Sequence, residues 1–329
     1  MENKPLTVEL ETPRKRSLLR ADAVQKLAAF ASLIVMLIVF SLASPNFATF
    51  DNIVGILLST AVDGVLAVGV TFVIISGGID LSIGTVMTLS SVMSGVFITF
   101  WKLPVALGVL GGLVTGALCG FINGSVTAKL KIPPFVATLG MMMIARGLSL
   151  VISHSKPIYF TNTPVFREIA MGSILGVPNA VVIFLGVAVI ASVILTKTVL
   201  GRYNFALGSN EEATRLSGIN VDAWKIAIYT LCGMFSGLAG VIMASRLDSA
   251  QPSLGMGYEL EAIAAAVIGG TSLSGGEGSI LGTVIGAFIM SVLTNGLRIL
   301  SVPQEWQMVV IGAIVIMAVY ADIIRRRKQ

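Results

Sequence analysis

The sequence predicts an all-α membrane protein, a polytopic bundle of about ten transmembrane helices. Only 12% of its 329 residues are charged while 55% are hydrophobic, and the mean hydropathy is +0.92. Ordinary soluble domains carry about 25% charged residues, so this chain has too little polar surface to cover its apolar side chains in water. Apolar runs of about 20 residues, the length needed to cross about 30 Å of hydrocarbon, recur along the chain. This composition therefore predicts lipid as the solvent.

Ten segments are apolar enough to be candidates, and together they form one predicted transmembrane domain over residues 27–324. Polar and glycine-rich stretches interrupt the third and the eighth segment. We expect these two to be broken or re-entrant helices, whose backbone groups are satisfied by protein or by a water-filled cavity. The ten segments are 27–44, 53–75, 82–100, 104–128, 132–153, 178–196, 226–245, 260–274, 279–300 and 305–323.

Two tails flank this domain, a polar one at residues 1–26 and a short basic one at 325–329. The first tail is longer than the basic region of a signal peptide, so we expect 28–44 to be retained as a helix. Placing both tails in the cytoplasm puts sixteen Lys and Arg residues inside and five outside, with Arg146 left within a span. This bias is what the positive-inside rule requires. The pI of about 9.3 therefore reflects charges that flank spans and does not indicate nucleic acid binding.

The same orientation places a long outer loop at residues 154–177 and a long cytoplasmic loop at 197–225. Within the cytoplasmic loop, the run from Asn210 to Leu216 is typical of a short polar helix that Asn210 caps and Gly218 ends. A short helix held at the cytoplasmic face by two spans suits a lever that a partner pushes. The alternative is an ordinary solvated loop.

A faint internal repeat relates the two halves of the chain. The spacing Gly112-x-x-x-Gly116 is followed 17 residues on by a proline, and Gly282-x-x-x-Gly286 is followed by a proline at the same distance, with an offset of 170 residues. Five spans separate the copies, so they would have opposite orientations, as inverted repeats do in many transporters. The alternative is chance recurrence in glycine-rich helices.

Two ionisable residues lie well inside predicted spans, where each costs about 2.5–3.5 kcal/mol on insertion scales. They are Asp63 in the second span and Arg146 in the fifth, and the helical rise places them at similar depths. We expect that they pair or line a shared polar path, for which Thr138 is a further candidate. The alternative is that Arg146 extends to the outer headgroups. Asp80, before the third span, is explained by helix capping.

Several catalytic and binding motifs are absent from the sequence. No G-x-x-x-x-G-K-[ST] phosphate loop occurs, and the glycine-rich run 269–279 contains no Lys and carries Glu277, so we expect a tight cytoplasmic turn there. No HExxH motif and no Ser-His-Asp set is present. His154 is the only histidine, and Cys119 and Cys232 lie in apolar runs, so we expect buried thiols and no metal site. The chain is therefore not predicted to be an enzyme and cannot hydrolyse ATP itself.

Longer motifs spread nearly from end to end of the chain carry a resemblance to one family. They occupy residues 44–47, 75–84 (with Gly77, Gly78 and Asp80), 134–140 (with Thr138), 146–147, 200–203, 208–221, 258–265 and 268–276 (with Gly269, Gly270, Gly275 and Gly276). Together they resemble the ribose-type permease subunits of bacterial ABC sugar importers, the binding-protein-dependent monosaccharide permeases. Only the first 26 residues and the outer loop match poorly.

The resemblance implies a transport system shared between several proteins. A second permease copy would complete a homo- or heterodimer in the lipid bilayer of the bacterial cytoplasmic (inner) membrane. A cytoplasmic pair of ABC ATPase subunits would bind ATP and Mg, and a periplasmic or lipid-anchored binding protein would deliver the sugar. The resemblance implies no cofactor for this chain.

The resemblance also implies that the short cytoplasmic helix is the coupling helix on which the ATPase docks. The family signature E-A-A-x-x-x-G is matched by Glu212-Ala213-Thr214 and Gly218, and Thr214 departs from the second Ala. The expected function is import of ribose or a related pentose or hexose. The alternative is an ATP-independent secondary transporter or facilitator for a small polar solute. The residues implied in docking are Asn210, Glu211, Glu212, Arg215 and Gly218.

Overall fold

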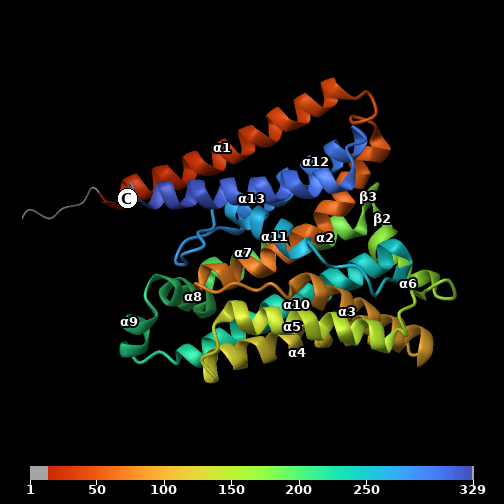
Figure 1. The fold of residues 1–329 in the computed structure, drawn as a ribbon, viewed down its shortest axis with the longest axis horizontal. Helices are drawn as coiled ribbons and strands as arrows, with labels where there is room; N and C mark the ends of the chain where they lie inside the picture. Colours follow the sequence, from red (N-terminus) through yellow and green to blue (C-terminus); the bar gives the residue numbers. More distant parts are fainter. Residues whose placement is uncertain (1–13, 328–329) are drawn as a thin grey trace, which may run out of the picture.

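The computed structural model describes residues 14–327 of the chain, and nearly all of its regular structure is helical (Figure 1). Four two-residue strands pair as β1 with β4 and β2 with β3, both antiparallel. The elements are α1 Arg14–Ala43, α2 Phe50–Ile75, α3 Ile83–Gly95, the π-helical turn η1 Val96–Phe100, α4 Val105–Lys129, α5 Pro134–Ile152, β1 Ile158–Tyr159, α6 Pro164–Met171, β2 Ser173–Ile174, β3 Val177–Pro178, α7 Asn179–Lys197, α8 Val199–Ser209, α9 Glu211–Leu216, α10 Val221–Leu247, β4 Ser249–Ala250, α11 Tyr258–Ile268, α12 Ile280–Ile299 and α13 Gln304–Arg327.

The predicted spans correspond closely to the helices. Within the described residues, eight helices are long and apolar enough to cross a membrane, and α1 adds a shorter apolar stretch, Leu27–Ala43. Helix α1 begins at Arg14, so part of the predicted tail is helical. Residues 1–13 and 328–329, which hold the rest of the two predicted tails, lie outside the described residues. The fold is thus the predicted all-α membrane bundle.

The predicted eighth segment is a broken crossing. Helix α11 has 11 residues and is only about 16 Å long at 1.5 Å per residue, too short to span the hydrocarbon. Non-helical residues 251–257 precede it and contact the first turns of α3, where the Thr88 hydroxyl donates a hydrogen bond of 2.8 Å to the Leu254 carbonyl. The predicted third segment differs, because α3 and η1 run without interruption over Ile83–Phe100, 18 residues. The expectation that the third segment is broken is therefore wrong.

The packing of the helices has the symmetry that an inverted repeat requires. Helix α2 packs against α11 and α12, and α10, five spans later, packs against α3 and α4. Within the halves, α3 packs on α4 and α11 packs on α12. Both predicted Gly-x-x-x-Gly motifs lie at such contacts, because a Cβ on Gly116 would collide with Gly233 of α10, and a Cβ on Gly286 would collide with Ala265 of α11.

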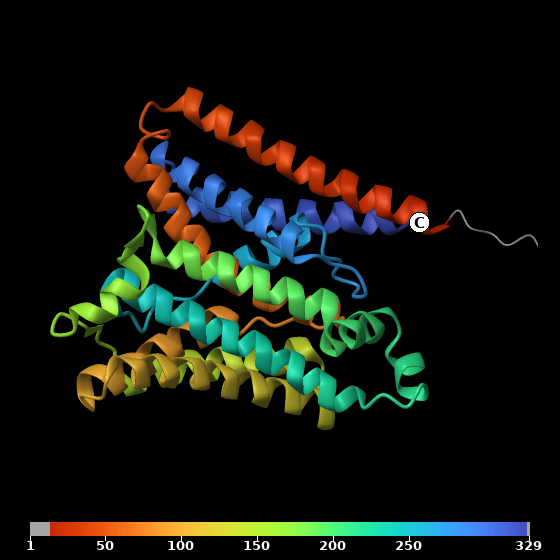
Figure 2. The same cartoon turned by 180° about the vertical axis from the view of Figure 1, so that it is seen from behind.

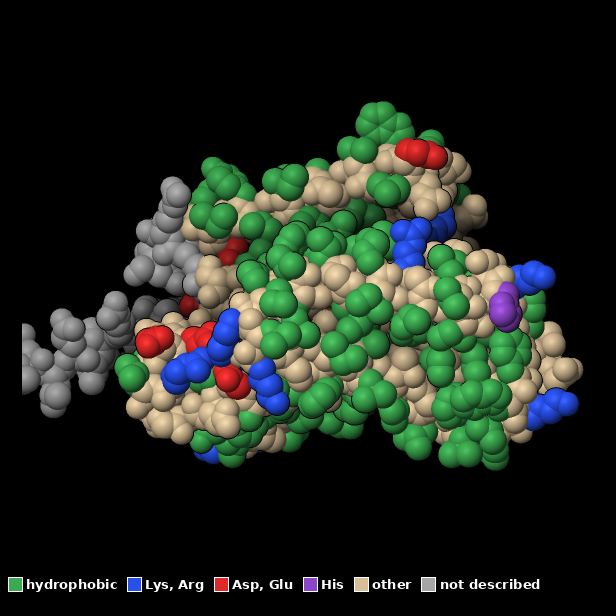
Figure 3. Space-filling model, turned by 60° about the horizontal axis from the view of Figure 1, so that its bottom comes forward, with side chains coloured by type: hydrophobic (Ala, Val, Ile, Leu, Met, Phe, Trp, Pro, Cys, Tyr) green, Lys and Arg blue, Asp and Glu red, His purple; other side chains and the backbone are tan. Residues whose placement is uncertain are grey.

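The molecule has two polar ends and an apolar middle. Helices α8 and α9 lie at the same end as the start of α1 and the end of α13, whereas α6, β2 and β3 lie at the opposite end (Figure 1 and Figure 2). Charged side chains gather at these ends, and hydrophobic ones cover the surface between them (Figure 3). The predicted outer loop is ordered there, since β1 pairs with β4 at the end of α10. The two described chain ends therefore share one face with the predicted cytoplasmic loop.

Candidate functional site

The short helix α9 forms as predicted, at the end of the molecule that carries both chain ends. The Asn210 side chain caps it by accepting a hydrogen bond of 2.9 Å from the Ala213 amide. Gly218 follows the helix with a φ of +82°, a backbone conformation that only glycine adopts without strain. The cap and the glycine fix a helix of six residues between α8 and α10.

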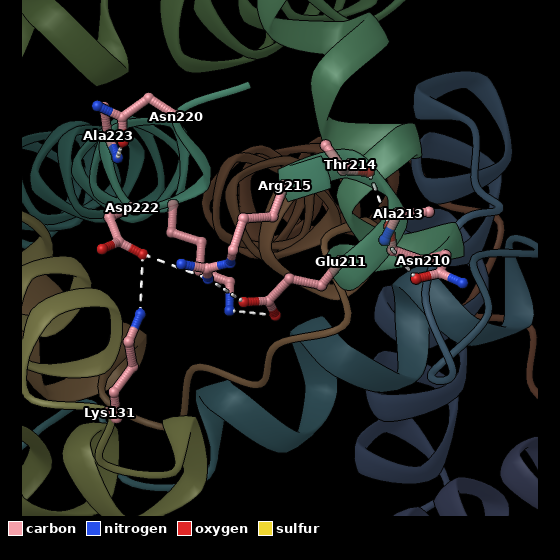
Figure 4. A network of polar contacts seen from close by, with 10 residues as sticks. Lys131, Asn210, Glu211, Ala213, Thr214, Arg215, Asn220, Asp222 and Ala223 are labelled. Carbon is pink, nitrogen blue, oxygen red and sulfur yellow. Dashed lines mark hydrogen bonds and ion pairs between the residues drawn. The ribbon is translucent and has the colours of Figure 1, made fainter. Parts of the chain in front are cut away.

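A chain of ion pairs ties α9 to the membrane helices (Figure 4). Glu211 accepts hydrogen bonds from Arg215 at 3.1 Å and from Lys225 of α10 at 2.6 Å. Arg215 also lies 3.6 Å from Asp222, which in turn pairs at 2.9 Å with Lys131 in the turn between α4 and α5. The ion pairs thus join α9 to α10 and, through Asp222, to the turn between α4 and α5.

The electrostatics of Glu211 follow from these contacts. Partial burial acts to raise the pKa of its carboxyl, but the hydrogen bonds and positive charges of Lys225 and Arg215 outweigh this effect. The pKa of Glu211 therefore lies below its usual range, and the residue is ionised at neutral pH. Its role is to hold α9 in place.

The opposite face of α9 is free to meet another protein. Glu212 and Ala213 are exposed, and Leu216 exposes 81% of its surface. Thr214 is buried, and its hydroxyl donates to the Asn210 carbonyl at 2.8 Å. Thr214, at which the sequence departs from the family signature, therefore faces the protein interior. The exposed face of the helix is unchanged by this departure.

The Gly77-Gly78 motif and Asp80 have structural contacts in this state. Gly77 has a φ of +82°. Asp80 is buried and accepts hydrogen bonds from both the amide and the hydroxyl of Ser82, at 2.8 and 2.6 Å. Ser82, which directly precedes α3, is the N-cap residue. Asp80 is therefore not the cap itself, and its carboxylate orients Ser82 instead. The amide of Asn123 in α4 completes the cluster by donating to Ser82 Oγ at 2.9 Å.

Thr138, a candidate for the polar path, also serves the structure. It is fully buried, and its hydroxyl donates to the Pro134 carbonyl within α5 at 2.9 Å and to the Ile79 carbonyl at 3.3 Å. It therefore joins the first turn of α5 to the non-helical segment before α3.

The glycine-rich run forms a turn against the predicted cytoplasmic ends of α2 and α8. Gly270, Gly275 and Gly276 have φ values between +76° and +96°. The amide of Gly276 donates to the carbonyl of Ile75, the last residue of α2, at 2.9 Å. Gly269 packs against the backbone of α12. The tight turn predicted for this run is confirmed.

The structure separates Asp63 from Arg146. Arg146 is exposed on α5, whereas Asp63 is 8% exposed and lines an internal cavity on the other side of α2. The expected pairing of the two is therefore wrong, because similar depth does not bring two helices into contact. Instead Asp63 shares its cavity with Arg246, Glu261 and Arg298.

This cavity has a volume of about 680 Å³ and lies between α2, α10, α11, α12 and α13. Sequence reasoning missed three of its charged residues because they lie near the ends of predicted spans, where charges are expected to face solvent. The sequence offered one signal for this site, because Glu261 is a carboxylate at the start of a predicted span that is interrupted. Polar residues of the wall include Ser59, Ser253, Tyr258, Thr294, Asn295, Gln304 and Gln307.

The two cysteines, Cys119 and Cys232, are buried free thiols, as expected. Among the described residues, no group of three or more His, Cys, Asp or Glu side chains is arranged to hold a metal ion.

Comparison with known proteins places the chain in a family. Residues 52–319 match the family described as "Branched-chain amino acid transport system / permease component". The chain is 44% identical to the ribose import permease protein RbsC of Escherichia coli (strain K12), over 88% of this chain and 91% of that protein. It is also 44% identical to RbsC of Bacillus subtilis (strain 168), over 96% and 98% of the two chains.

The fructose import permease protein FrcC of Rhizobium meliloti is 40% identical, over 81% of this chain and 76% of that protein. Among solved structures, no match is found. The residues that match the family run from α2 into α13 and include α9. The chain therefore belongs to the family of branched-chain amino acid transport system permease components.

Proposed function

We propose that this chain is the membrane-spanning permease subunit of an ABC importer that moves a monosaccharide into the cytoplasm. Ribose or a related pentose or hexose is the substrate, and ATP hydrolysis on a separate subunit drives the movement. The observation that carries this proposal is the 44% identity to ribose import permeases across nearly the whole chain.

The partners follow from the same relation and from the geometry of α9. A cytoplasmic ATPase docks on the exposed face around Glu212 and Leu216, while Glu211 and Arg215 hold the opposite side against α10. A sugar-binding protein docks at the end that carries α6. A second permease copy completes a dimer in the bacterial cytoplasmic membrane, and chemical cross-linking in native membranes tests this arrangement.

The decisive experiment is uptake of labelled ribose into proteoliposomes that contain this chain, its ATPase and its binding protein. We expect uptake only when ATP is present on the ATPase side and the binding protein on the other. Uptake that continues without ATP would overturn the proposal in favour of a facilitator. Fructose, D-allose and L-arabinose are tested in parallel, since the ribose assignment depends on relatives.

Docking on α9 is tested by charge reversal. Glu212→Lys should weaken the association of the ATPase with the detergent-purified permease and reduce uptake. For ATPase association the matched control is Glu168→Lys, because Glu168 is also exposed but belongs to α6 at the opposite end. Uptake does not serve as the readout for this control, because the binding protein is proposed to dock at the end that carries α6. Equal ATPase binding by both variants would show that α9 is not the docking site.

A further inference from the structure

The cavity beside Asp63 has a balanced set of charges that do not pair with one another. Two carboxylates, Asp63 and Glu261, and two guanidinium groups, Arg246 and Arg298, line it. Among the described residues, no ion pair within 4.0 Å joins any of these four. Charges inside a membrane protein are costly unless they face a cavity or serve a function. Arg246 donates one hydrogen bond of 3.3 Å to the hydroxyl of Ser59 in the same wall. The four charged side chains otherwise line the cavity and are available to a solute.

Three buried polar atoms in the same wall lack a hydrogen-bond partner within the described structure. They are Oδ1 of Asp63, a residue that is only 8% exposed, Oγ of Ser291 and Oγ1 of Thr294. Buried polar groups in native proteins are almost always hydrogen-bonded. Their position at a polar cavity indicates that a bound solute, or the water it displaces, completes their hydrogen bonding.

The cavity lies toward the predicted outer end of the bundle, and a buried contact between two of its helices lies on the cytoplasmic side of it. Arg246 is one residue before the end of α10, which leads into β4 and the outer loop, and Arg298 is one residue before the end of α12. Two helical turns deeper, α2 and α12 are joined by a buried 2.8 Å hydrogen bond between the hydroxyls of Thr71 and Thr283. This contact therefore lies between the cavity and the cytoplasmic end of the bundle.

The chemistry of the wall suits a neutral, hydroxyl-rich molecule. A sugar hydroxyl is both a donor and an acceptor, and carboxylates supply acceptors while guanidinium groups supply donors. A simple ion would meet both attractive and repulsive charges. The volume of about 680 Å³ also falls in the range of about 300–1,000 Å³ that is typical of small-molecule sites.

We propose that this cavity is a monosaccharide-binding site that holds the sugar in the outer half of the permease before the Thr71–Thr283 contact opens. Asp63 and Glu261 accept hydrogen bonds from sugar hydroxyls, and Arg246 and Arg298 donate to them. This inference rests on the proposed function and names the site through which the sugar passes. Asp63, Glu261, Arg246 and Arg298 thus determine the solute specificity of the membrane step.

The test is protection of an introduced cysteine from maleimide. Ser253 is exposed and lines the cavity, and both native cysteines are buried, so Ser253→Cys reports on access to the site. Without ATP, millimolar ribose should slow its labelling several-fold. Thr161→Cys, at an exposed position of the outer loop, is the matched control and should label at the same rate with and without sugar.

Charge removal tests the assigned side chains. Glu261→Gln and Arg298→Gln should each raise the ribose concentration that gives half-maximal protection by about tenfold or more, because hydrogen bonds to charged groups are the stronger ones. Arg146→Gln removes a guanidinium outside the cavity and should leave this concentration unchanged. Equal behaviour of all three variants would overturn the proposal.

The outcomes separate this proposal from the proposed function. If ATP-driven sugar uptake occurs but no transported sugar protects Ser253→Cys, the site is overturned and the importer stands. If L-leucine protects and no sugar does, the cavity binds zwitterions and the sugar assignment of the site is overturned. If no sugar is taken up in the presence of ATP and the binding protein, the proposed function itself fails.

Discussion

Neutralising Glu211 should loosen α9 without unfolding the bundle. Glu211→Gln keeps the shape of the side chain but removes two ion pairs, one with Arg215 at 3.1 Å and one with Lys225 at 2.6 Å. These pairs are partly exposed, with 42% of the Glu211 side chain accessible to solvent. The pair with Arg215 lies within α9, and the pair with Lys225 joins α9 to α10. Exposed pairs contribute about 0.2–1 kcal/mol each, so the two together contribute about 1 kcal/mol to keeping α9 folded and in place.

A loss of about 1 kcal/mol corresponds to a roughly fivefold increase in the population of locally opened α9. Hydrogen–deuterium exchange of the purified permease measures this population directly. The relevant amides are those of Thr214, Ser217 and Gly218, which are hydrogen-bonded to Asn210, Ala213 and Arg215 carbonyls. They should exchange about fivefold faster in Glu211→Gln at low salt.

Glu212→Gln is the matched control, because Glu212 is the adjacent carboxylate and makes no ion pair with another described residue. It should leave the exchange rates unchanged. At 1 M salt, where the screening length is only about 3 Å, the difference between the two variants should shrink. Identical exchange in both variants at low salt would refute the claim that the ion pairs hold α9.

Three further predictions follow from named contacts. The pKa of Glu211 is lowered in the folded state, so the contribution of Glu211 to the stability of α9 is complete above the usual Glu pKa and is lost as the pH falls through the folded pKa. Hydrogen–deuterium exchange of the α9 amides should therefore accelerate on acidification below about pH 4. Glu211→Gln should abolish this acceleration. Gly116→Leu should lower the melting temperature, since the new Cβ would collide with the backbone of Gly233 and Gly237, at a cost of about 1–3 kcal/mol or more. Gly186→Leu in α7, where a Cβ meets open space, should be tolerated. Equal melting temperatures of the two variants would contradict this packing. Tyr229→Phe removes a buried hydroxyl that has no hydrogen-bond partner within the described structure and should leave the melting temperature unchanged or raise it. Asn123→Ala loses the hydrogen bond to Ser82 and should lower the melting temperature. A lower melting temperature for Tyr229→Phe than for Asn123→Ala would refute these hydrogen-bond assignments.

The fold could be predicted from the sequence because the bilayer imposes a length on every crossing helix. Hydropathy located the spans, and the distribution of Lys and Arg predicted that both ends of the chain share a face. The local chemistry of Asn210 and Gly218 was enough to place α9. The eighth segment, 260–274, was recognised as interrupted, but its helix ends earlier than predicted, at Ile268. The residue after this end, Gly269, packs against the backbone of Gly282 in α12, a long-range contact that the local sequence does not indicate.

The polar cavity could not be predicted, because depth in the membrane gives only one coordinate of a side chain. Asp63 and Arg146 have similar predicted depths, yet their helices present them to different surroundings. Which way a residue faces depends on helix rotation, and rotation is set by long-range packing such as that of α2 on α11 and α12. Arg246 and Arg298 were assigned to solvent because they lie near span ends. Their place in the cavity wall became visible only once the five surrounding helices were assembled.

The central claim is that ATP hydrolysis on a partner drives sugar through this chain, and the ratio of internal to external sugar tests it most directly. Proteoliposomes with the complete importer are given labelled ribose, or whichever sugar of the panel is taken up, and the ratio is measured at steady state. With ATP on the ATPase side, we predict accumulation to a ratio well above one, and Glu212→Lys should reduce it. A ratio that stops at one with or without ATP would contradict the account and identify the chain as a facilitator.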